Sequence, residues 1–411
     1  MDVAIVNLIV VSPNIRPRLL FESPSVVPVT ALEEVNIIQF GRALSNLGHR
    51  VTIYVADAFL DEAEVELGHR LTVRSVRTRL HIPFHPAVLP LAPTLTEPGL
   101  LDHVDVVQSG EYHHPSTLLV AQSARRAGIP SIVWQETFQR MRQPGAYYQR
   151  LYEASFGRRV ERLTNRFVPR TMKARQFLRD LGVPDDRIGP WIPTGVDTDF
   201  FRPGDGTSGA KPEAWPTDCH VLGIVGRLGA DKGIDIAIQA LRILRRRGLS
   251  VGLLIRGSGP EQAALERLAR DLDVANRIRF VPQLPREELR RFYNSLDLVL
   301  LTSRIDLLPF ALLEAASCAR ASVVTAVGAV EDIVKDGVTG RVVPPGSPER
   351  LADAVTPLLQ DPERRRSMGL AARRWMESTF AFPRVAMAMS DVYERAASGT
   401  SLEVAPQGMQ S

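Results

Sequence analysis

Cysteine is scarce in this sequence, and long apolar runs are absent. The two cysteines, Cys219 and Cys318, do not make a disulfide framework, and neither lies at a metal-binding spacing from another cysteine or histidine. A chain with so little cysteine fits a reducing cytoplasm best. No stretch approaches the roughly 20 apolar residues that a membrane-spanning helix needs. The short apolar run Val3–Val11 has no basic segment before it, so we expect a buried strand there and not a signal peptide.

Lysine is scarcer than any other charged residue. Lysine and arginine together number 50, and only Lys173, Lys211, Lys232 and Lys335 are lysines. Genomic base composition is the simplest explanation, but a lysine inside a motif is then less easily accidental. The net charge of +4 over 411 residues gives no argument for a nucleic-acid partner.

Short apolar strands alternate with helical segments in both halves of the chain. This alternation predicts parallel sheets covered by helices on both faces, in an α/β chain long enough for two domains. In the first half we expect strands at 3–11, 51–56, 104–108 and 131–134 and helices at 30–47 and 115–127. In the second half we expect strands at 221–225, 251–255, 277–281, 296–301 and 322–325 and helices at 234–247, 262–271 and 309–318.

Composition marks the irregular segments. The proline-rich stretch 81–98 predicts a loop or an extended segment. The stretch 202–220 is rich in proline, glycine and serine and predicts a linker. A long helical region from Pro362 to Ala397 is broken near 380–383, and the polar tail 398–411 is expected to be disordered.

Arginine is concentrated between residues 140 and 179. Arg158 and Arg162 share a helix face, with a further arginine between them. One interpretation is a solvated face paired with Glu153 and Glu161. The other is a surface for anionic lipid headgroups, which predicts peripheral contact with the inner face of a membrane.

The segment Gly226–Gly233 (GRLGADKG) follows a strand and opens a helix. Arg227 and Lys232 bring two positive charges to this turn, and the helix start beyond them offers free N–H groups and a partial positive charge. A guanidinium and an ammonium together suit a diphosphate. Two surface cations at a strand end remain the alternative.

Two further segments carry candidate ligand-binding residues. Gly257 and Gly259 end the next strand and allow a ligand to approach the backbone closely. The segment 306–314 (DLLPFALLE) has Asp306 in the loop before a helix and Glu314 within it. A carboxylate on so apolar a helix must be paired, with arginine as the plain alternative, or bind hydroxyl groups.

The order of these segments resembles the C-terminal half of family 4 glycosyltransferases. GRLGADKG, then IRGSGP, DLLPFALLEAAS and VEDIVKDGVTGRVVPPG follow one another as they do in that family. The junction around residues 191–203 and the terminal helix at 380–393 are similar too. The resemblance covers about 165–393 well, and the combination is specific although each piece alone is not.

The resemblance implies two Rossmann-like doubly wound domains facing each other across a cleft, the GT-B fold. It implies an acceptor-side domain at 1–190, a nucleotide-sugar-binding domain at 191–379, and a helix at 380–397 that crosses back onto the first domain. It further implies a retaining transfer without a metal or cofactor, from a nucleoside-diphosphate sugar to a glycan, lipid-linked or small-molecule acceptor, as in cell-envelope biosynthesis.

The resemblance also implies roles for single residues. Arg227 and Lys232 match the pair that binds the donor diphosphate and stabilises the leaving group. Glu314 matches the residue that holds the donor ribose, and Asp306 matches the first acid of the family motif, which faces the donor sugar. The loop residues Leu308, Pro309 and Phe310 and the glycines Gly257 and Gly259 complete the expected donor site.

This chain departs from the family pattern at several points. Asp306 stands where glutamate is usual, and Ala319 and Ala321 follow Glu314 where glycine and proline are usual. Residues 12–33 lack the usual Gly-Gly loop. The family histidine after the strand at 104–108 is replaced by a segment with Glu111, His113 and His114, while Glu136 follows the next strand. We expect Glu111 or His113 to assist the acceptor hydroxyl, with loop polarity as the alternative.

Two other hypotheses stay open at this stage. One is a nucleotide-sugar epimerase or a phosphorylase with the same fold, although a phosphorylase needs a lysine for pyridoxal phosphate and Lys335 lies in an apparent turn. The other is a non-catalytic partner subunit that has kept the fold.

Overall fold

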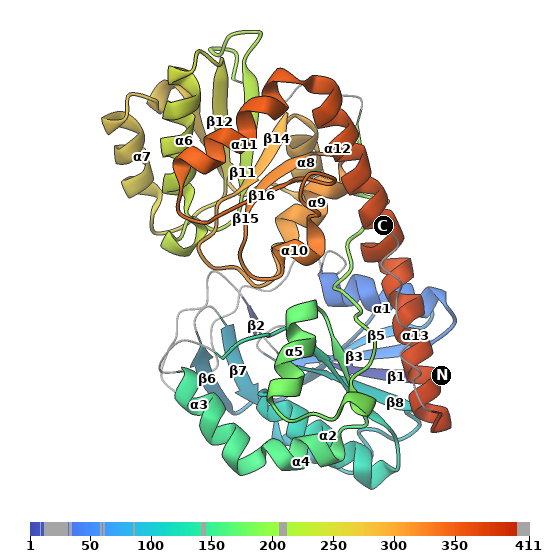
Figure 1. Cartoon of the computed structure of the whole chain (residues 1–411). Coiled ribbons are helices and arrows are strands. Elements are labelled where there is room, and N and C mark those ends of the chain that lie inside the picture. Colours follow the sequence, from blue (N-terminus) through green and yellow to red (C-terminus); the bar gives the residue numbers. More distant parts are fainter. Residues whose placement is uncertain are drawn as a thin grey trace. The chain divides into compact units, whose positions relative to one another are not determined.

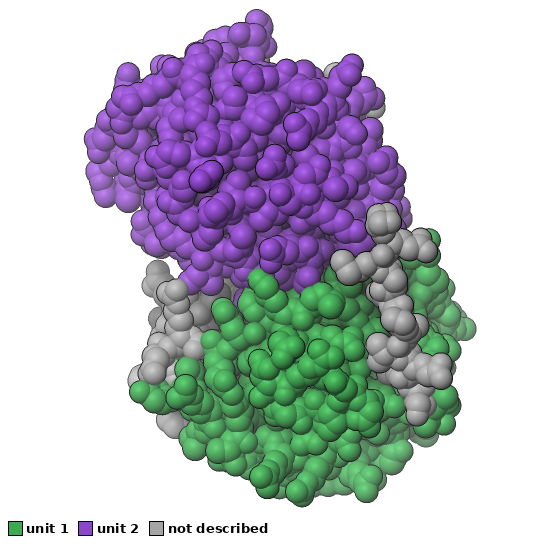
Figure 2. All heavy atoms as spheres, viewed as in Figure 1, with its two compact units in different colours: residues 1–195, 382–411 green, residues 196–381 purple. Residues whose placement is uncertain are grey.

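The computed structural model describes residues 1–8, 10–11, 32, 35–57, 60, 62–84, 87–140, 145–204 and 212–400. The chain forms two compact units (Figure 2). Unit 1 comprises Met1–Gly195 and Phe382–Ser411, and unit 2 comprises Val196–Ala381. The chain therefore passes between the units twice, at 195–196 and at 381–382.

Unit 1 is built on a seven-stranded sheet of order β10-β9-β8-β1-β3-β5-β4. All neighbouring strands are parallel except β4, which pairs antiparallel with β5 at the edge. The strands are β1 (Asp2–Val6), β3 (Arg50–Ala56), β4 (Glu64–Glu66), β5 (Leu71–Val76), β8 (Val106–Gly110), β9 (Ser131–Gln135) and β10 (Arg166–Pro169). Their apolar side chains are buried on both faces, as a parallel sheet requires.

Helices cover both faces of this sheet (Figure 1). On one face α1 and α13 pack against each other and against β1, β3 and β9. On the other face α2, α4 and α5 close two smaller apolar clusters. The helices are α1 (Asn36–Asn46), α2 (Pro115–Ala127), α3 (Gly145–Tyr152), a π-helical turn (Glu153–Gly157), α4 (Arg158–Leu163), α5 (Met172–Asp180) and α13 (Phe382–Ser398).

The expected strand Val3–Val11 is in fact two strands in different sheets. β1 ends at Val6, and β2 (Val10–Val11) pairs antiparallel with β7 (Ala87–Leu91). β7 also pairs with β6 (Leu80–Phe84). The stretch 81–98, predicted as a loop or an extended segment, thus contains extended strands of the sheet β2-β7-β6. Antiparallel strands tolerate proline where no ladder partner needs its N–H.

Unit 2 contains a six-stranded parallel sheet of order β13-β12-β11-β14-β15-β16. The strands are β11 (His220–Val225), β12 (Val251–Arg256), β13 (Ile278–Val281), β14 (Leu298–Leu301), β15 (Ser322–Thr325) and β16 (Arg341–Val343). Sequence order reverses between β11 and β14. This reversal makes the sheet doubly wound.

The helices of unit 2 lie on both faces of its sheet. α6 packs on α7 and α11 over one apolar cluster, while α9 contacts α8, β14 and β15. The helices are α6 (Ile234–Arg246), α7 (Gln262–Asp271), α8 (Arg286–Asn294), α9 (Phe310–Ser317), α10 (Val330–Ile333), α11 (Pro348–Gln360), α12 (Pro362–Trp375) and a π-helical turn (Met376–Phe380).

The segment 202–220 is not a linker between the units. Its described parts, 202–204 and 212–220, belong to unit 2. The Trp215 side chain is 6% exposed and lies so close to Gly252 that a Cβ there would come within 2.4 Å of its ring. The buried Trp215 side chain thus anchors this stretch to unit 2, although its composition predicted a linker.

The chain crosses from unit 1 to unit 2 about five residues later than the resemblance implied. Ile192 is buried in the core of unit 1, where its carbonyl accepts a hydrogen bond from the Trp134 indole at 2.9 Å. On the return, the helical region breaks at Ala381 and α13 begins at Phe382. The tail beyond residue 400 and the segment 12–31 lie outside the described residues.

Candidate functional site

The sheet order of unit 2 indicates where a ligand binds. In an open parallel sheet, ligands bind beyond the carboxyl ends of the strands where the strand order reverses. In unit 2 that point lies between β11 and β14. The loops that leave these two strands contain Arg227 and Lys232 after β11 and Asp306 after β14.

The loop after β11 is held close to the loop after β14. A short 3-10 turn, Ala230–Lys232, ends at Gly233, whose φ is +59°, and α6 begins at Ile234. A Cβ on Gly233 would lie 2.1 Å from the Thr302 carbonyl oxygen, so only glycine fits there. The expected sequence of strand, cationic turn and helix start is therefore present, with the 3-10 turn inserted.

Lys232 and Asp306 form an ion pair at the reversal point. Lys232 Nζ lies 2.7 Å from Asp306 Oδ2, and the two side chains are 24% and 11% exposed. The same oxygen accepts a hydrogen bond from Ser303 Oγ at 3.1 Å, and Oδ1 accepts one from the Leu307 N–H at 3.0 Å. The Asp306 carboxylate is thus fixed by three donors and in turn fixes the ammonium group.

Arg227 is paired in a similar way. Its guanidinium donates to Asp231 Oδ1 at 2.7 Å, and both side chains are about one third exposed at 33% and 34%. Each of the two cations expected to bind a diphosphate therefore has its own aspartate. The two pairs make a site whose positive groups are held in place and whose carboxylates balance their charge when no anion is bound.

Arg304, in the loop after β14, is hydrogen-bonded to the loop after β11 and to the first turn of α6. Its guanidinium makes two hydrogen bonds to Asp235 at 2.8 and 2.6 Å and one to the Ala230 carbonyl at 3.0 Å. Its own N–H donates to the Asp231 carbonyl at 2.7 Å. Arg304, Ser303 and the pairing role of Asp231 could not be foreseen from the sequence, because none of these residues stands out by spacing.

Gly257 and Gly259 have a structural reason to be glycine. A Cβ on Gly257 would lie 1.9 Å from the Gly226 carbonyl oxygen, and one on Gly259 would lie 2.4 Å from that of Leu228. The close approach is to the neighbouring loop after β11. Contact of these glycines with a donor remains a prediction.

The residues expected around the start of α9 lie together. Pro309 is the N-cap residue of α9 and not its first helical residue. Leu308 is 6% exposed, while Phe310 is 37% exposed.

Glu314 is paired with a tyrosine, and it forms no ion pair with an arginine within the part of the chain that the structure describes. The Tyr293 hydroxyl donates to Glu314 Oε2 at 2.7 Å. Burial raises the pKa of Glu314 to about 6, while the Tyr293 hydrogen bond and the charges of Arg256 and Arg286 oppose this rise. Tyr293, on the buried side of α8, was not foreseen, because a buried aromatic residue in a helix usually only packs.

In unit 1, the Glu111 carboxylate is hydrogen-bonded to residues at the end of β9 and just after it. Its φ is +53°, a conformation uncommon for residues other than glycine. Its carboxylate accepts hydrogen bonds from the N–H groups of Glu136 at 2.9 Å and Thr137 at 3.2 Å and from the Gln135 side chain at 2.8 Å. Burial raises its pKa. The carboxylate thereby ties the end of β8 to the end of β9.

The two histidines beyond Glu111 are buried as well. His113 Nε2 lies 2.8 Å from Glu153, which also pairs with Arg140. His114 caps α2, accepting the Ser116 N–H at 3.2 Å, and burial lowers its pKa to about 3. The structure does not bring His113 onto the Glu111 carboxylate, and the assistance expected from either residue remains a prediction.

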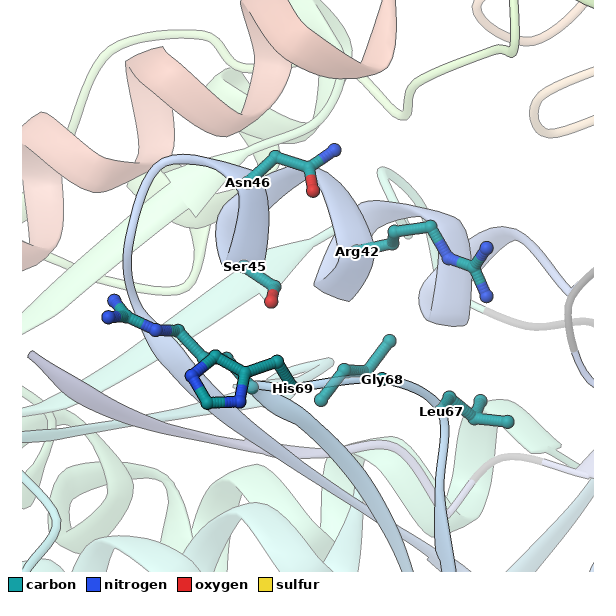
Figure 3. A pocket seen from close by; sticks show the side chains of 8 residues that line it. Arg42, Ser45, Asn46, Leu67, Gly68 and His69 are labelled. Atoms are coloured by element: carbon teal, nitrogen blue, oxygen red, sulfur yellow. The ribbon is translucent and has the colours of Figure 1, made fainter.

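A surface pocket of unit 1 lies elsewhere (Figure 3). It is formed by the last turn of α1 and the turn before β5, and its lining residues are Arg42, Ser45, Asn46, Leu67, Gly68, His69, Arg70 and Leu71. These segments lie at the amino ends of β3 and β5. This is the opposite edge of the sheet from the loops that hold Glu111 and Glu136.

Three further observations bear on the earlier hypotheses. Lys335, the lysine considered for pyridoxal phosphate, has its ammonium 3.7 Å from the centre of the Trp375 ring. Within the described residues, no group of three or more His, Cys, Asp or Glu side chains is arranged to hold a metal ion. In the same part of the chain, no helix combines the length and apolar character needed to cross a membrane.

Comparison with solved structures shows the fold. The Anabaena protein HepE, solved in complex with UDP, has a TM-score of 0.71 at 15% identity, with 96% of this chain and 100% of that chain covered. Sucrose-phosphate synthase from Thermosynechococcus elongatus also scores 0.71, at 18% identity over 97% and 100% of the two chains. The two Rossmann-like units are those of the GT-B fold of glycosyltransferases.

Comparison of sequences defines the family. Residues 34–200 match the model described as Glycosyltransferase Family 4, and residues 209–375 match that of Glycosyl transferases group 1. The D-inositol 3-phosphate glycosyltransferase of Frankia alni is 30% identical over 365 residues, 82% of this chain and 88% of that protein. The chain belongs to the family 4 glycosyltransferases.

A second relative is similar over a shorter region. The GDP-mannose-dependent alpha-(1-6)-phosphatidylinositol monomannoside mannosyltransferase of Mycolicibacterium smegmatis is 35% identical over 192 residues. The match covers 45% of this chain and 50% of that protein.

Proposed function

We propose that unit 2 binds a nucleoside-diphosphate sugar and that the enzyme transfers the sugar to an acceptor hydroxyl with retention of its anomeric configuration. The observation that carries this proposal is the meeting of Lys232 and Asp306, 2.7 Å apart, where the strand order of the sheet reverses. Arg227 lies on the same loop as Lys232. Two positioned cations at this place suit a diphosphate.

The chemical role of the cations follows from the charge that the reaction produces. When the bond between the anomeric carbon and the diphosphate breaks, negative charge develops on the leaving oxygen. The Arg227 guanidinium and the Lys232 ammonium stabilise this charge, and because their side chains are already held in place, little reorganisation is needed. The reaction then requires no metal ion or cofactor.

The rest of the donor is proposed to lie along the start of α9. Glu314 accepts hydrogen bonds from the ribose hydroxyls, with Tyr293 orienting its carboxylate. The segment Leu308–Phe310 and the glycines Gly257 and Gly259 line the remaining contacts. Asp306 has its carboxylate committed to Lys232, so its effect on the donor sugar is exerted at least in part through that lysine.

The relatives suggest which donors and acceptors to examine first. A structure of HepE with UDP-glucose and a mannosyltransferase named for GDP-mannose indicate uridine and guanosine donors. The two curated relatives named above act on inositol phosphate and on a phosphatidylinositol mannoside. We propose an acceptor of this phosphoinositol kind, soluble or lipid-linked, bound by unit 1 and used in cell-envelope synthesis. Cys219 and Cys318 are both buried and neither forms a disulfide in the described part of the chain, which suits a cytoplasmic enzyme.

Turnover of a donor panel tests the proposal. UDP-glucose, UDP-N-acetylglucosamine and GDP-mannose are each incubated with the enzyme, with and without inositol 3-phosphate or phosphatidylinositol, and release of nucleoside diphosphate is measured. We expect one donor to be used, and Lys232→Ala to lower its turnover about a hundredfold or more with the fold unchanged. Lys335→Ala, whose lysine lies on Trp375, is the matched control and keeps its turnover. Equal turnover by both variants would refute the assignment of the diphosphate site.

A further inference from the structure

The segment from α3 to α4 has one buried side and one exposed side. α3, the π-helical turn and α4 follow one another without a break from Gly145 to Leu163 (Figure 1). The buried residues of this segment are Gly145, Gln149, Tyr152, Gly157 and Val160. The opposite side is in contact with solvent.

Large apolar side chains of this segment are unusually exposed. Tyr147 is 62% exposed, Leu151 is 68% exposed and Phe156 is 43% exposed. Tyr147 and Leu151 are four residues apart, so they are neighbours on the helix surface. Three such side chains within ten residues differ from the single exposed apolar residues that any surface carries.

The segment also carries exposed positive charge that the described chain does not neutralise. Arg150, Arg158, Arg159 and Arg162 are all exposed, and no ion pair involves any of them in the described part of the chain. The two acids of the segment, Glu153 and Glu161, are only half-exposed, and Glu153 is paired with Arg140 and His113. By contrast, Arg247 and Arg304 are exposed but paired with aspartates.

An apolar and cationic helix face matches the surface of an anionic bilayer. Tyrosine, phenylalanine and leucine enter the region between headgroups and acyl chains, while arginines extend toward lipid phosphates. We infer that the α3–α4 face, defined here as Tyr147, Leu151, Phe156 and the four arginines named above, binds the surface of membranes that contain anionic lipids. This inference requires no donor site and so stands apart from the proposed reaction.

A second copy of the chain is a poorer occupant of this face. In a two-fold symmetric contact the same patch meets itself, so the arginines of one copy would face those of the other. An anionic lipid surface offers an apolar layer for the exposed apolar side chains and negative charge for the arginines. It would also bring the enzyme to any lipid-linked acceptor.

Vesicle co-sedimentation of the full chain tests the inference. Vesicles of phosphatidylcholine alone are compared with vesicles of equal parts phosphatidylcholine and phosphatidylglycerol, without donor or acceptor. We expect binding only to the anionic vesicles, with affinity that falls as salt is added. Equal binding to both kinds of vesicle, or binding to neither, would overturn the inference.

Paired variants separate the contributions of the face. Arg158→Gln/Arg159→Gln/Arg162→Gln is expected to lower partitioning about tenfold or more, and Tyr147→Ser/Leu151→Ser to lower it at any salt concentration. The matched control is Arg364→Gln/Arg366→Gln/Arg374→Gln on α12, whose arginines are also exposed. The control removes the same charge and is expected to keep wild-type partitioning.

Two results would contradict the inference at this step. One is the same loss of partitioning in the α12 control as in the α4 variant, which would indicate only a net-charge effect. The other is a dimer in analytical ultracentrifugation that Tyr147→Ser/Leu151→Ser dissociates, which would show that the face is a protein interface. Donor hydrolysis in vesicle-free buffer is expected to be unchanged in both face variants, which separates this test from that of the reaction.

Discussion

The strand-end loops of the two units use their charged residues differently. In unit 2, the loops after β11 and β14 hold their charged side chains in ion pairs, Arg227 with Asp231 and Lys232 with Asp306. In unit 1, the loops after β8 and β9 turn Glu111 inward onto main-chain N–H groups. A carboxylate that neutralises a nearby cation can be displaced by an anionic ligand, whereas one that holds two strand ends together is part of the framework.

The largest effect that separates these roles is expected at Asp306. Asp306→Asn removes the counter-charge of Lys232 while it keeps size and some hydrogen bonding. Because the ammonium is then less well positioned, we expect kcat to fall by about 10- to 100-fold with a smaller change in donor KM. Steady-state kinetics on the accepted donor measures both constants. A rise in KM alone would show that Asp306 contributes to donor binding and not to the position of Lys232.

Glu111→Gln tests the framework role in unit 1. The glutamine amide would present a donor group to the three N–H donors that now surround the carboxylate. We expect unfolding to become easier by about 1–3 kcal/mol, with kcat of the folded enzyme nearly unchanged. Thermal unfolding and kinetics on the same sample check this. An unchanged melting temperature with lost kcat would instead support the acceptor-assisting role predicted from the sequence.

Tyr293→Phe and pH together test Glu314. An ionised carboxylate accepts hydrogen bonds from ribose hydroxyls more strongly than a protonated one, and burial raises the pKa of Glu314 to about 6, so donor KM should rise as the pH falls below about 6. The Tyr293 hydrogen bond lowers this pKa, so its loss should move the rise to higher pH and weaken the donor by roughly 3- to 10-fold. KM measured from about pH 5 to about pH 8 shows both effects. A KM independent of pH would exclude Glu314 from the donor site.

The smallest effect is expected where the chain departs from the family at Ala319. This residue has φ +54° and ends α9, with its N–H bound to the Ala316 carbonyl and the Arg320 N–H bound to that of Ala315. Such a helix end favours glycine, so Ala319→Gly should stabilise the protein by about 1 kcal/mol. Ala329→Gly, at an ordinary φ of −96°, is the control without gain. Urea unfolding midpoints decide between gain and no change.

The sequence predicted elements best where local signals bound them. α7 spans Gln262–Asp271 and α2 spans Pro115–Ala127 as expected, the latter between proline and a glycine with φ +72°. The pairing of β6 with β7 was not predicted, because the periodicity of a sequence does not show which strands pair with each other. The division of the apolar run 3–11 between two sheets was missed for the same reason.

The residues of the candidate site were named from the sequence, but the contacts between them were not predicted. Arg227, Lys232, Asp306 and Glu314 were each named, yet Lys232 and Asp306 are 74 residues apart in sequence and only the fold shows that they pair. Glu314 was known to need a partner, and Tyr293 could not be chosen among many buried aromatic residues. Glu111 was predicted to assist the acceptor hydroxyl because it is a carboxylate at the end of a strand. Its burial depends on the contacts between the ends of β8 and β9, which the sequence does not show.

The most direct test of the central claim is calorimetric titration with nucleoside diphosphates. UDP and GDP are titrated into the wild-type protein, Lys232→Ala and Lys335→Ala. If the ends of β11 and β14 bind the donor diphosphate, one of the two ligands binds, Lys232→Ala weakens it about tenfold or more, and Lys335→Ala does not. Equal affinity in all three proteins would contradict the claim.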